Sequence, residues 1–152
     1  MSQPETALSQ ERKPRQDQSI SPAQAAVNRA RELIGTKWTH QGRVPGAGLD
    51  CIGLAVQCAT AAGVEVDDVT DYGRVEPPEA IMSNVMKYCK EVPRAEAQPG
   101  DILIMRWRDI PQHLGIYTGD NWMIHSYEKE GVVAQQLIPF WEKRVVGVFR
   151  II

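Results

Sequence analysis

Gln98-Pro99-Gly100-Asp101-Ile102-Leu103 divides the chain into two parts with different hydrophobic periodicity. The Pro-Gly-Asp run is a strong turn signal. Before this turn, apolar residues recur at helical spacing, and after it they follow the spacing of strands. Helices followed by a run of strands predict an α+β domain with one antiparallel sheet.

Short apolar segments follow the turn, and glycine-containing turns or longer loops join them. Five strands are expected, at 102–107, 113–118, 122–128, 132–137 and 145–151. The sequence therefore predicts a five-stranded antiparallel sheet in the second part of the chain.

Three helices are expected before the turn. Ser21-Pro22-Ala23-Gln24 carries the capping signals of the first helix, and Gly35 is a natural stop for it. After a glycine-rich loop over 36–49, Asp50 is a plausible N-cap for a second helix over about 51–62. A third helix is expected to open at Pro77-Pro78-Glu79. Its buried stripe would consist of Met82, Val85, Cys89 and Val92.

Composition limits the classes of function. The formal net charge is −2 and no stripe of Lys and Arg is evident, so nucleic-acid binding is not expected. No apolar run reaches the roughly 18 residues of a membrane span. The N-terminus lacks the pattern of a secretory signal, so we expect synthesis in the cytoplasm without a signal peptide. Residues 1–20 are polar and predict a flexible tail or a docking arm, and residues 21–152 predict one domain.

Cys51 is the candidate nucleophile, because it stands in the first turn of the second helix. A free thiol has a pKa near 8.5, and a helix N-terminus lowers it by less than about one unit. A neighbouring histidine must therefore take the proton, and we expect it to remain as an imidazolium beside the sulfur. Cys58 and Cys89 are predicted to be core residues.

The register of the hairpin over 113–128 decides whether His113 and His125 share a face of the sheet. A two-residue loop at 119–120 would separate them, whereas a three-residue loop at 119–121 places His113 opposite Tyr127 and His125 opposite Gly115. The second register also gathers the apolar residues on the other face, so hydrophobic sorting favours it. His113 is then the candidate base and His125 the residue that orients it.

One cysteine and two histidines can also bind zinc. No fourth ligand is evident and no CxxC pair is present, so neither a metal nor another cofactor is predicted.

Four short motifs in the same order resemble the NlpC/P60 cysteine peptidases. Asp50-Cys51-Ile52-Gly53 is similar to their Asp-Cys-Ser-Gly, and Pro99-Gly100-Asp101-Ile102 to their Pro-Gly-Asp-Leu. His113-Leu114-Gly115-Ile116-Tyr117 resembles their His-Val-Gly-Ile-Tyr, and Met123-Ile124-His125-Ser126 the segment with the third catalytic residue.

The resemblance implies a papain-like α+β fold and hydrolysis of peptide bonds in peptidoglycan stem peptides. It implies Cys51, His113 and His125 as catalytic residues, with the Cys51 backbone N–H in the oxyanion hole. It also implies substrate contacts by Asp50 and by Trp38, which occupies the place of a family tyrosine. The family's serine after the cysteine is Ile52 here.

The stretch His40-Gln41-Gly42-Arg43 is similar to the phage-tail and gene-transfer-agent subgroup of these peptidases. That resemblance implies a place in a virion or tail-like particle, with tail proteins as partners. Two alternatives stay open: a tail assembly or adaptor protein with a weak or vestigial site, and an acyltransferase or amidase that acts on another substrate.

Overall fold

The computed structural model describes residues 20–68, 78–107 and 109–152. Its helices are α3 (Pro22–Glu32), α4 (Cys51–Ala61), α5 (Pro78–Met86) and α6 (Pro139–Glu142), with a 3-10 turn η1 (Arg94–Glu96). Its strands are β1 (Arg43–Val44), β2 (Gly48–Leu49), β3 (Cys89–Val92), β4 (Ile102–Trp107), β5 (Ile110–Gly119), β6 (Trp122–Tyr127), β7 (Gly131–Gln136) and β8 (Val145–Ile151). The predicted tail lies outside the described residues, apart from Ile20 at its end.

The main sheet has six strands in the order β3-β8-β4-β5-β6-β7, and every neighbouring pair is antiparallel. A separate two-stranded ladder joins β1 and β2 inside the predicted loop over 36–49. The α+β prediction is therefore confirmed, and the predicted count of five strands in the sheet is one too few.

The missing strand is β3, which the sequence assigned to the third helix. Helix α5 ends at Met86, and Cys89 pairs with Ile151 while Val92 pairs with Val148 of β8. The spacing of Cys89 and Val92 fits a helix as well as a strand, so pattern alone could not separate the two. Pairing with the open edge of β8 decides the conformation, and Cys89 remains buried as predicted.

The two long helices near the N-terminus begin where the capping signals place them. The Ser21 hydroxyl accepts a hydrogen bond from the Gln24 N–H at 3.1 Å. The Asp50 carboxylate accepts one from the Gly53 N–H at 2.8 Å. Each bond satisfies one of the N–H groups that a helix start leaves without an intrahelical acceptor.

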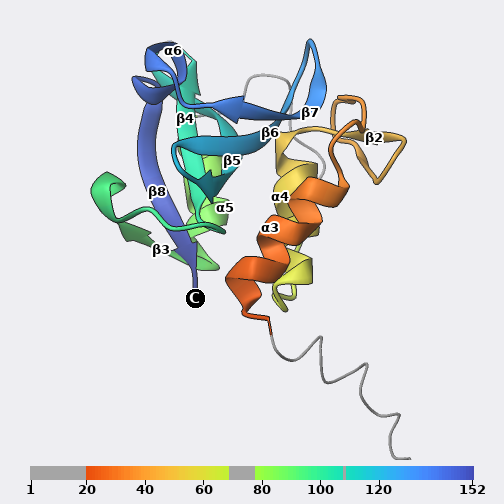
Figure 1. Cartoon of the computed structure of the whole chain (residues 1–152), viewed down its shortest axis with the longest axis horizontal. Helices are drawn as coiled ribbons and strands as arrows, with labels where there is room; N and C mark the ends of the chain where they lie inside the picture. The colour runs from red at the N-terminus through yellow and green to blue at the C-terminus, as the bar shows by residue number, and fades with distance from the viewer. Residues whose placement is uncertain (1–19, 69–77, 108) are drawn as a thin grey trace, which may run out of the picture.

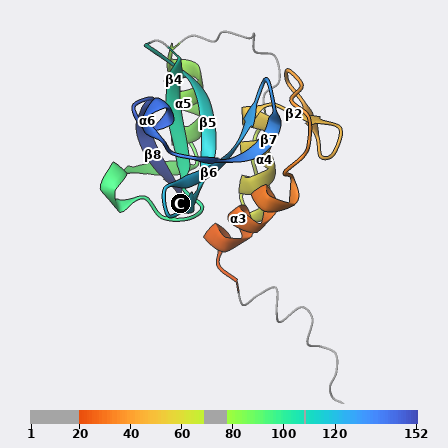
Figure 2. The ribbon, with the colours of Figure 1, turned by 45° about the horizontal axis from the view of Figure 1, so that its top comes forward.

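The sheet separates two apolar clusters. Residues of α3, α4 and α5 pack on one face, against strand residues that include Leu114, Ile116 and Ile124. The other face carries Tyr117, Met123 and, from α6, Trp141. Figures 1 and 2 show α3 and α4 side by side and apart from α6, which lies beside β8 and β4.

The β5–β6 hairpin has the predicted facing of residues but a different turn. Tyr117 pairs with Met123 and Ile116 with Ile124, which is the register predicted for histidines on one face. The turn itself has two residues, Asp120 and Asn121, both with positive φ, as in the tight hairpin turns that match strand twist. A bulge between Tyr117 and Gly119 restores the register that a three-residue loop would have produced.

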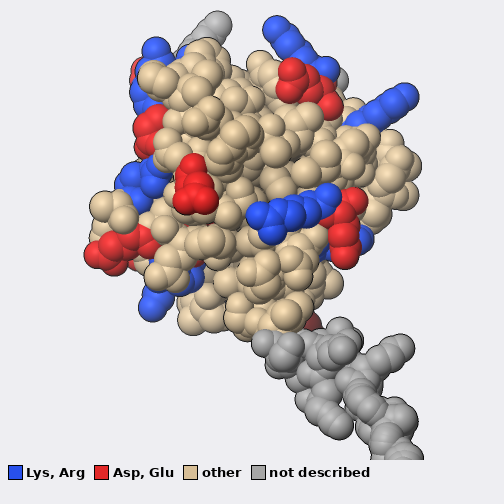
Figure 3. All heavy atoms as spheres, in the orientation of Figure 1, with Lys and Arg blue, Asp and Glu red and all other residues tan. Residues whose placement is uncertain are grey.

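On the face shown in Figure 3, basic and acidic side chains are interspersed and no large area carries one sign of charge. Within the described residues, no helix is long and apolar enough to cross a membrane.

Candidate active site

Cys51 is the first residue of α4 and is 9% exposed. The chain reaches it through β2, and the first turn of α4 packs closely on the preceding loop. A β-carbon at Gly53 would collide with the carbonyl oxygen of Gly42, so only glycine permits this approach. The glycine at position 53 therefore lets the start of α4 lie directly against the backbone of this loop.

Asp50 is 4% exposed, and its carboxylate is held from several sides. Besides capping α4, it accepts a hydrogen bond from the Gln41 N–H at 2.9 Å and pairs with the Arg43 guanidinium at 3.1 Å. Asp50 thus fixes the loop before Cys51 onto the start of α4. Its predicted contact with substrate stays a prediction.

The strands β5 and β6 stop pairing before they reach the two histidines. Their ladder ends at Ile116 and Ile124, although both strands continue beyond it. Past this point the Leu114 backbone offsets part of the rise that burial causes in the pKa of the Cys51 thiol. The thiol is therefore seated against β5, at the residue that follows His113.

The structure brings the two predicted histidines together. His113 Nε2 and His125 Nδ1 are 2.7 Å apart, and the two side chains are 6% and 0% exposed. One nitrogen of the pair must donate to the other. Because this contact occupies Nε2 of His113, Nδ1 is the ring nitrogen that it leaves for other chemistry.

Gly115 makes room for this contact. A β-carbon there would lie 3.3 Å from the His125 Cβ and 2.9 Å from the Met123 sulfur. The glycine therefore lets the His125 side chain cross over β5 toward His113.

Aromatic rings enclose the histidine pair. Trp107 stacks on His113 with ring centroids 6.3 Å apart, and Tyr127 stacks on His125 at 5.7 Å. Trp141 stands nearly perpendicular to His125, at 4.8 Å and 81°. These rings remove the imidazoles from water. No local pattern in the sequence predicts that Trp141 of α6 lies against His125.

Burial sets the resting charges of the site. It raises the pKa of Cys51 to about 12, and the Asp50 carboxylate adds to this rise. Burial, and next the neighbouring His125, lower the pKa of His113 to about 3. A neutral thiol and a neutral imidazole are the result, whereas the sequence predicted an ion pair. That argument treated the thiol as exposed and omitted the cost of burying both charges.

One further contact ties the histidine strand to the nucleophile loop. The Ser126 hydroxyl donates a hydrogen bond of 2.6 Å to the carbonyl oxygen of Leu49, and both groups are buried. Ser126 follows His125 directly and Leu49 lies two residues before Cys51. The motif that carries His125 includes this serine, but only the fold reveals its acceptor.

Trp38 is half-buried and stacks against His40, with ring centroids 6.3 Å apart and an interplanar angle of 29°. Both residues belong to the loop that leads to Cys51. The structure thus shows a ring contact for Trp38, and its predicted contact with substrate stays a prediction.

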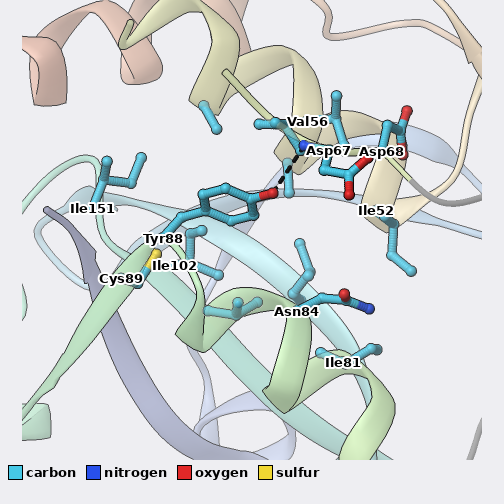
Figure 4. Close-up of a pocket in the computed structure, with 15 residues that line it drawn as sticks. Ile52, Val56, Asp67, Asp68, Ile81, Asn84, Tyr88, Cys89, Ile102 and Ile151 are labelled. Atoms are coloured by element: carbon cyan, nitrogen blue, oxygen red, sulfur yellow. Dashed lines mark hydrogen bonds between the residues drawn. The ribbon is translucent and has the colours of Figure 1, made fainter. Parts of the chain in front are cut away.

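An apolar pocket of about 100 Å³ runs along α4 beside the nucleophile (Figure 4). Ile52, the residue after Cys51, borders it together with Leu114, and Val56 extends the apolar wall along α4. Asp67 and Asp68 also line it. The residue that replaces the expected serine therefore forms part of an apolar surface next to the thiol.

Across the described part of the chain, no group of three or more His, Cys, Asp and Glu side chains is arranged to hold a metal ion. All three cysteines are free and buried. Cys58 is 1% exposed and lies in the helical core cluster, as predicted.

Residues 35–150 match the NlpC/P60 family. The matched region is most of the chain and includes all three candidate catalytic residues. The chain belongs to the NlpC/P60 family. The match begins at the end of the first helical segment and extends nearly to the last residue of β8.

Two curated relatives carry hydrolase names. Gamma-DL-glutamyl hydrolase of Bacillus subtilis is 26% identical over 135 residues, which are 82% of this chain and 29% of that protein. Murein DD-endopeptidase MepS/Murein LD-carboxypeptidase of Escherichia coli is 34% identical over 56 residues, which are 36% of this chain and 30% of that protein. The matched regions cover less than a third of either relative.

Solved NlpC/P60 structures share the fold. A protein similar to a lipoprotein of this family, from Staphylococcus aureus, has a TM-score of 0.66 at 21% identity and covers 86% of this chain and 41% of its own. The peptidoglycan hydrolase RipB of Mycobacterium tuberculosis has a TM-score of 0.65 at 19% identity, over 86% of this chain and 65% of its own. At these identities the likeness confirms the α+β NlpC/P60 fold.

Proposed function

We propose that this NlpC/P60 domain is a cysteine peptidase that hydrolyses peptide bonds in peptidoglycan stem peptides. The observation that carries the proposal is the contact of 2.7 Å between His113 and His125, two buried histidines from the strands against which α4 packs with Cys51 at its start. The names of the two curated relatives refer to gamma-DL-glutamyl and murein bonds, which supports this class of substrate.

Cys51 is the nucleophile and His113 the general base. As the sulfur attacks the scissile carbonyl carbon, the thiol proton passes to His113 Nδ1. The carbonyl oxygen becomes an oxyanion, for which the Cys51 backbone N–H is the donor. The intermediate then collapses to a thioester, and the leaving amine takes the proton from His113.

Deacylation reverses the roles. His113 accepts a proton from water, whose oxygen attacks the thioester carbon, and the departing sulfur recovers that proton. The products are a new carboxyl group and the regenerated Cys51 thiol. His125 Nδ1 accepts the Nε2–H of His113 throughout and stabilises the imidazolium that forms in each half-reaction.

Neutral resting groups suit this sequence of steps. Because burial opposes both the thiolate and the imidazolium, the proton moves only when a substrate carbonyl is present to accept the electron pair of the sulfur. The apolar pocket beside Ile52 offers surface to an uncharged part of the substrate near the scissile bond.

The proposed location is a phage-type tail or tail-like particle, which would carry the enzyme to the cell wall with tail proteins as partners. The resemblance of the stretch at 40–43 to the tail-associated subgroup supports this location. Immunoblots of purified particles test it, since the protein is expected in the particle fraction and its absence there would contradict the proposal.

Digestion of purified peptidoglycan under reducing conditions tests the activity. Wild type is expected to release new amino termini, and Cys51→Ala none. Cys58→Ala is the matched control, since it removes a buried thiol from the same helix. Failure of all three folded proteins to release amino termini would contradict the peptidase and support the adaptor alternative, which the burial of Cys51 and the presence of Ile52 favour.

A further inference from the structure

His125 has one ring nitrogen that the proposed mechanism leaves unexplained. The side chain is 0% exposed, and its Nδ1 makes the contact with His113. Its Nε2 is buried and has no hydrogen-bond partner among the described residues. A buried polar atom without a partner costs about 1–3 kcal/mol, so such an atom in a site calls for an explanation.

The protonation of His125 Nε2 decides whether His113 can act as the general base. If His125 carries its proton on Nε2, its Nδ1 is an acceptor and must receive the Nε2–H of His113, whose Nδ1 is then free to take the thiol proton. If His125 instead carries its proton on Nδ1, neutral His113 has its proton on Nδ1 and cannot act as the base there. The site needs a device that selects the first tautomer.

Trp141 is placed to select it. Its ring centroid is 4.8 Å from that of His125, and the two planes meet at 81°. The face of an aromatic ring is negative, so it attracts an N–H and repels the lone pair of a deprotonated ring nitrogen. Tyr127 stacks parallel to His125 at 14° and keeps the imidazole in this plane.

We propose that Trp141 is a positioning residue, whose ring face accepts the Nε2–H of His125 and thereby makes His125 Nδ1 the acceptor for His113. The catalytic consequence rests on the proposed function, whereas the tautomer itself does not.

An ion pair outside the site, between Arg94 and Glu142, positions the helix that carries Trp141. The neighbouring residue, Glu142, receives two hydrogen bonds from the Arg94 guanidinium, at 2.7 and 2.8 Å. Arg94 also donates to the Asn121 side chain at 2.9 Å. Helix α6 has only four residues, so this bidentate pair fixes it to η1 and to the β5–β6 turn. Trp141 itself is 6% exposed and packs within the apolar cluster on this face of the sheet.

The wild-type protein alone provides the first test. In nitrogen-detected NMR of histidine-labelled protein, His125 is expected as the Nε2–H tautomer with an upfield-shifted proton, because the proposed contact places that proton over the Trp141 face. A spectrum in which His125 is protonated on Nδ1 instead would overturn the inference, whatever the activity of the enzyme.

Variants provide the second test. Trp141→Leu is expected to mix the two tautomers and to lower kcat on a stem peptide by about 100-fold, the scale of a catalytic group displaced by about 1 Å. Trp141→Phe, which keeps an aromatic face, is expected to retain the tautomer and most of the kcat. Phe140→Leu is the matched control on the same helix, since the Phe140 ring contacts Trp107 and Trp141 rather than the histidines.

An unchanged tautomer and unchanged kcat in folded Trp141→Leu would overturn the inference while the proposed peptidase stands. The expected tautomer in a wild-type protein without hydrolytic activity would instead contradict the peptidase and leave the role of Trp141 intact. If Trp141→Leu does not fold, the tautomer of His125 in the wild-type spectrum and in Trp141→Phe tests the inference instead.

Discussion

Ser126 on β6 donates a hydrogen bond of 2.6 Å to the carbonyl oxygen of Leu49 on β2, across 77 positions of sequence. Ser126 adjoins His125, and Leu49 lies two residues before Cys51. This bond therefore couples the strand that carries a histidine to the loop that carries the thiol, and it is buried at both ends.

Ser126→Ala is expected to destabilise the fold by about 1–3 kcal/mol, because it leaves the Leu49 carbonyl buried without this donor. Chemical unfolding monitored by tryptophan fluorescence measures the change. Ser83→Ala, at an exposed position on α5, is the matched control and is expected to change little. Equal stability of wild type and Ser126→Ala would show that the bond does not hold the loop.

Two substitutions at Asp50 distinguish its role as the N-cap of α4 from the effect of its charge on Cys51. Asp50→Asn keeps a good N-cap but removes the carboxylate that raises the pKa of Cys51. We expect Cys51 in this variant to react with iodoacetamide at lower pH than in wild type. Asp50→Ala removes the cap as well, and is expected to lose a further ~0.5–2 kcal/mol of stability. An unshifted alkylation profile in Asp50→Asn would contradict the electrostatic role.

Alkylation of native protein reports the resting state of Cys51. Because burial raises its pKa to about 12, the rate is expected to keep rising with pH well beyond 8.5, where a free thiol levels off. Peptide mapping by mass spectrometry distinguishes Cys51 from Cys58 and Cys89, and urea-unfolded protein supplies the free-thiol reference. An apparent pKa below about 7 would instead reveal a thiolate–imidazolium pair.

The histidine pair predicts a loss of stability in acid. Burial lowers the pKa of His113 to about 3 and that of His125 to about 4, against about 6.5 in the unfolded chain. Between these values the unfolded state binds more protons, so the free energy of unfolding falls as pH falls, by up to about 1.4 kcal/mol per pH unit for each imidazole. No such loss is expected from this pair above pH 6.5.

Unfolding midpoints measured between pH 7 and pH 4 test this slope. The double variant with His113→Asn and His125→Asn is the comparison, because other groups contribute equally to both proteins. Its slope is expected to be shallower, and identical slopes would contradict neutral burial of the pair.

Local signals in the sequence were sufficient for much of this architecture. Caps marked the starts of α3 and α4, and hydrophobic alternation correctly gave the shared face of His113 and His125. The helix–strand boundary after Met86 could not be found this way, because only the edge of β8 decides that Cys89–Val92 forms a strand. Long-range contacts were equally invisible: neither the acceptor of Ser126 nor the arrival of Trp141 at His125 has a local pattern.

The central claim is that Cys51 and His113 act as one catalytic unit. Its most direct test compares kcat/KM on a soluble stem peptide for Cys51→Ala, His113→Ala and the double variant, each shown to be folded. When two groups act as one unit, removing either group costs about as much activity as removing both. The three variants are therefore expected to share one low residual kcat/KM. Losses that add in the double variant, or a Cys51→Ala variant as active as wild type, would contradict the claim.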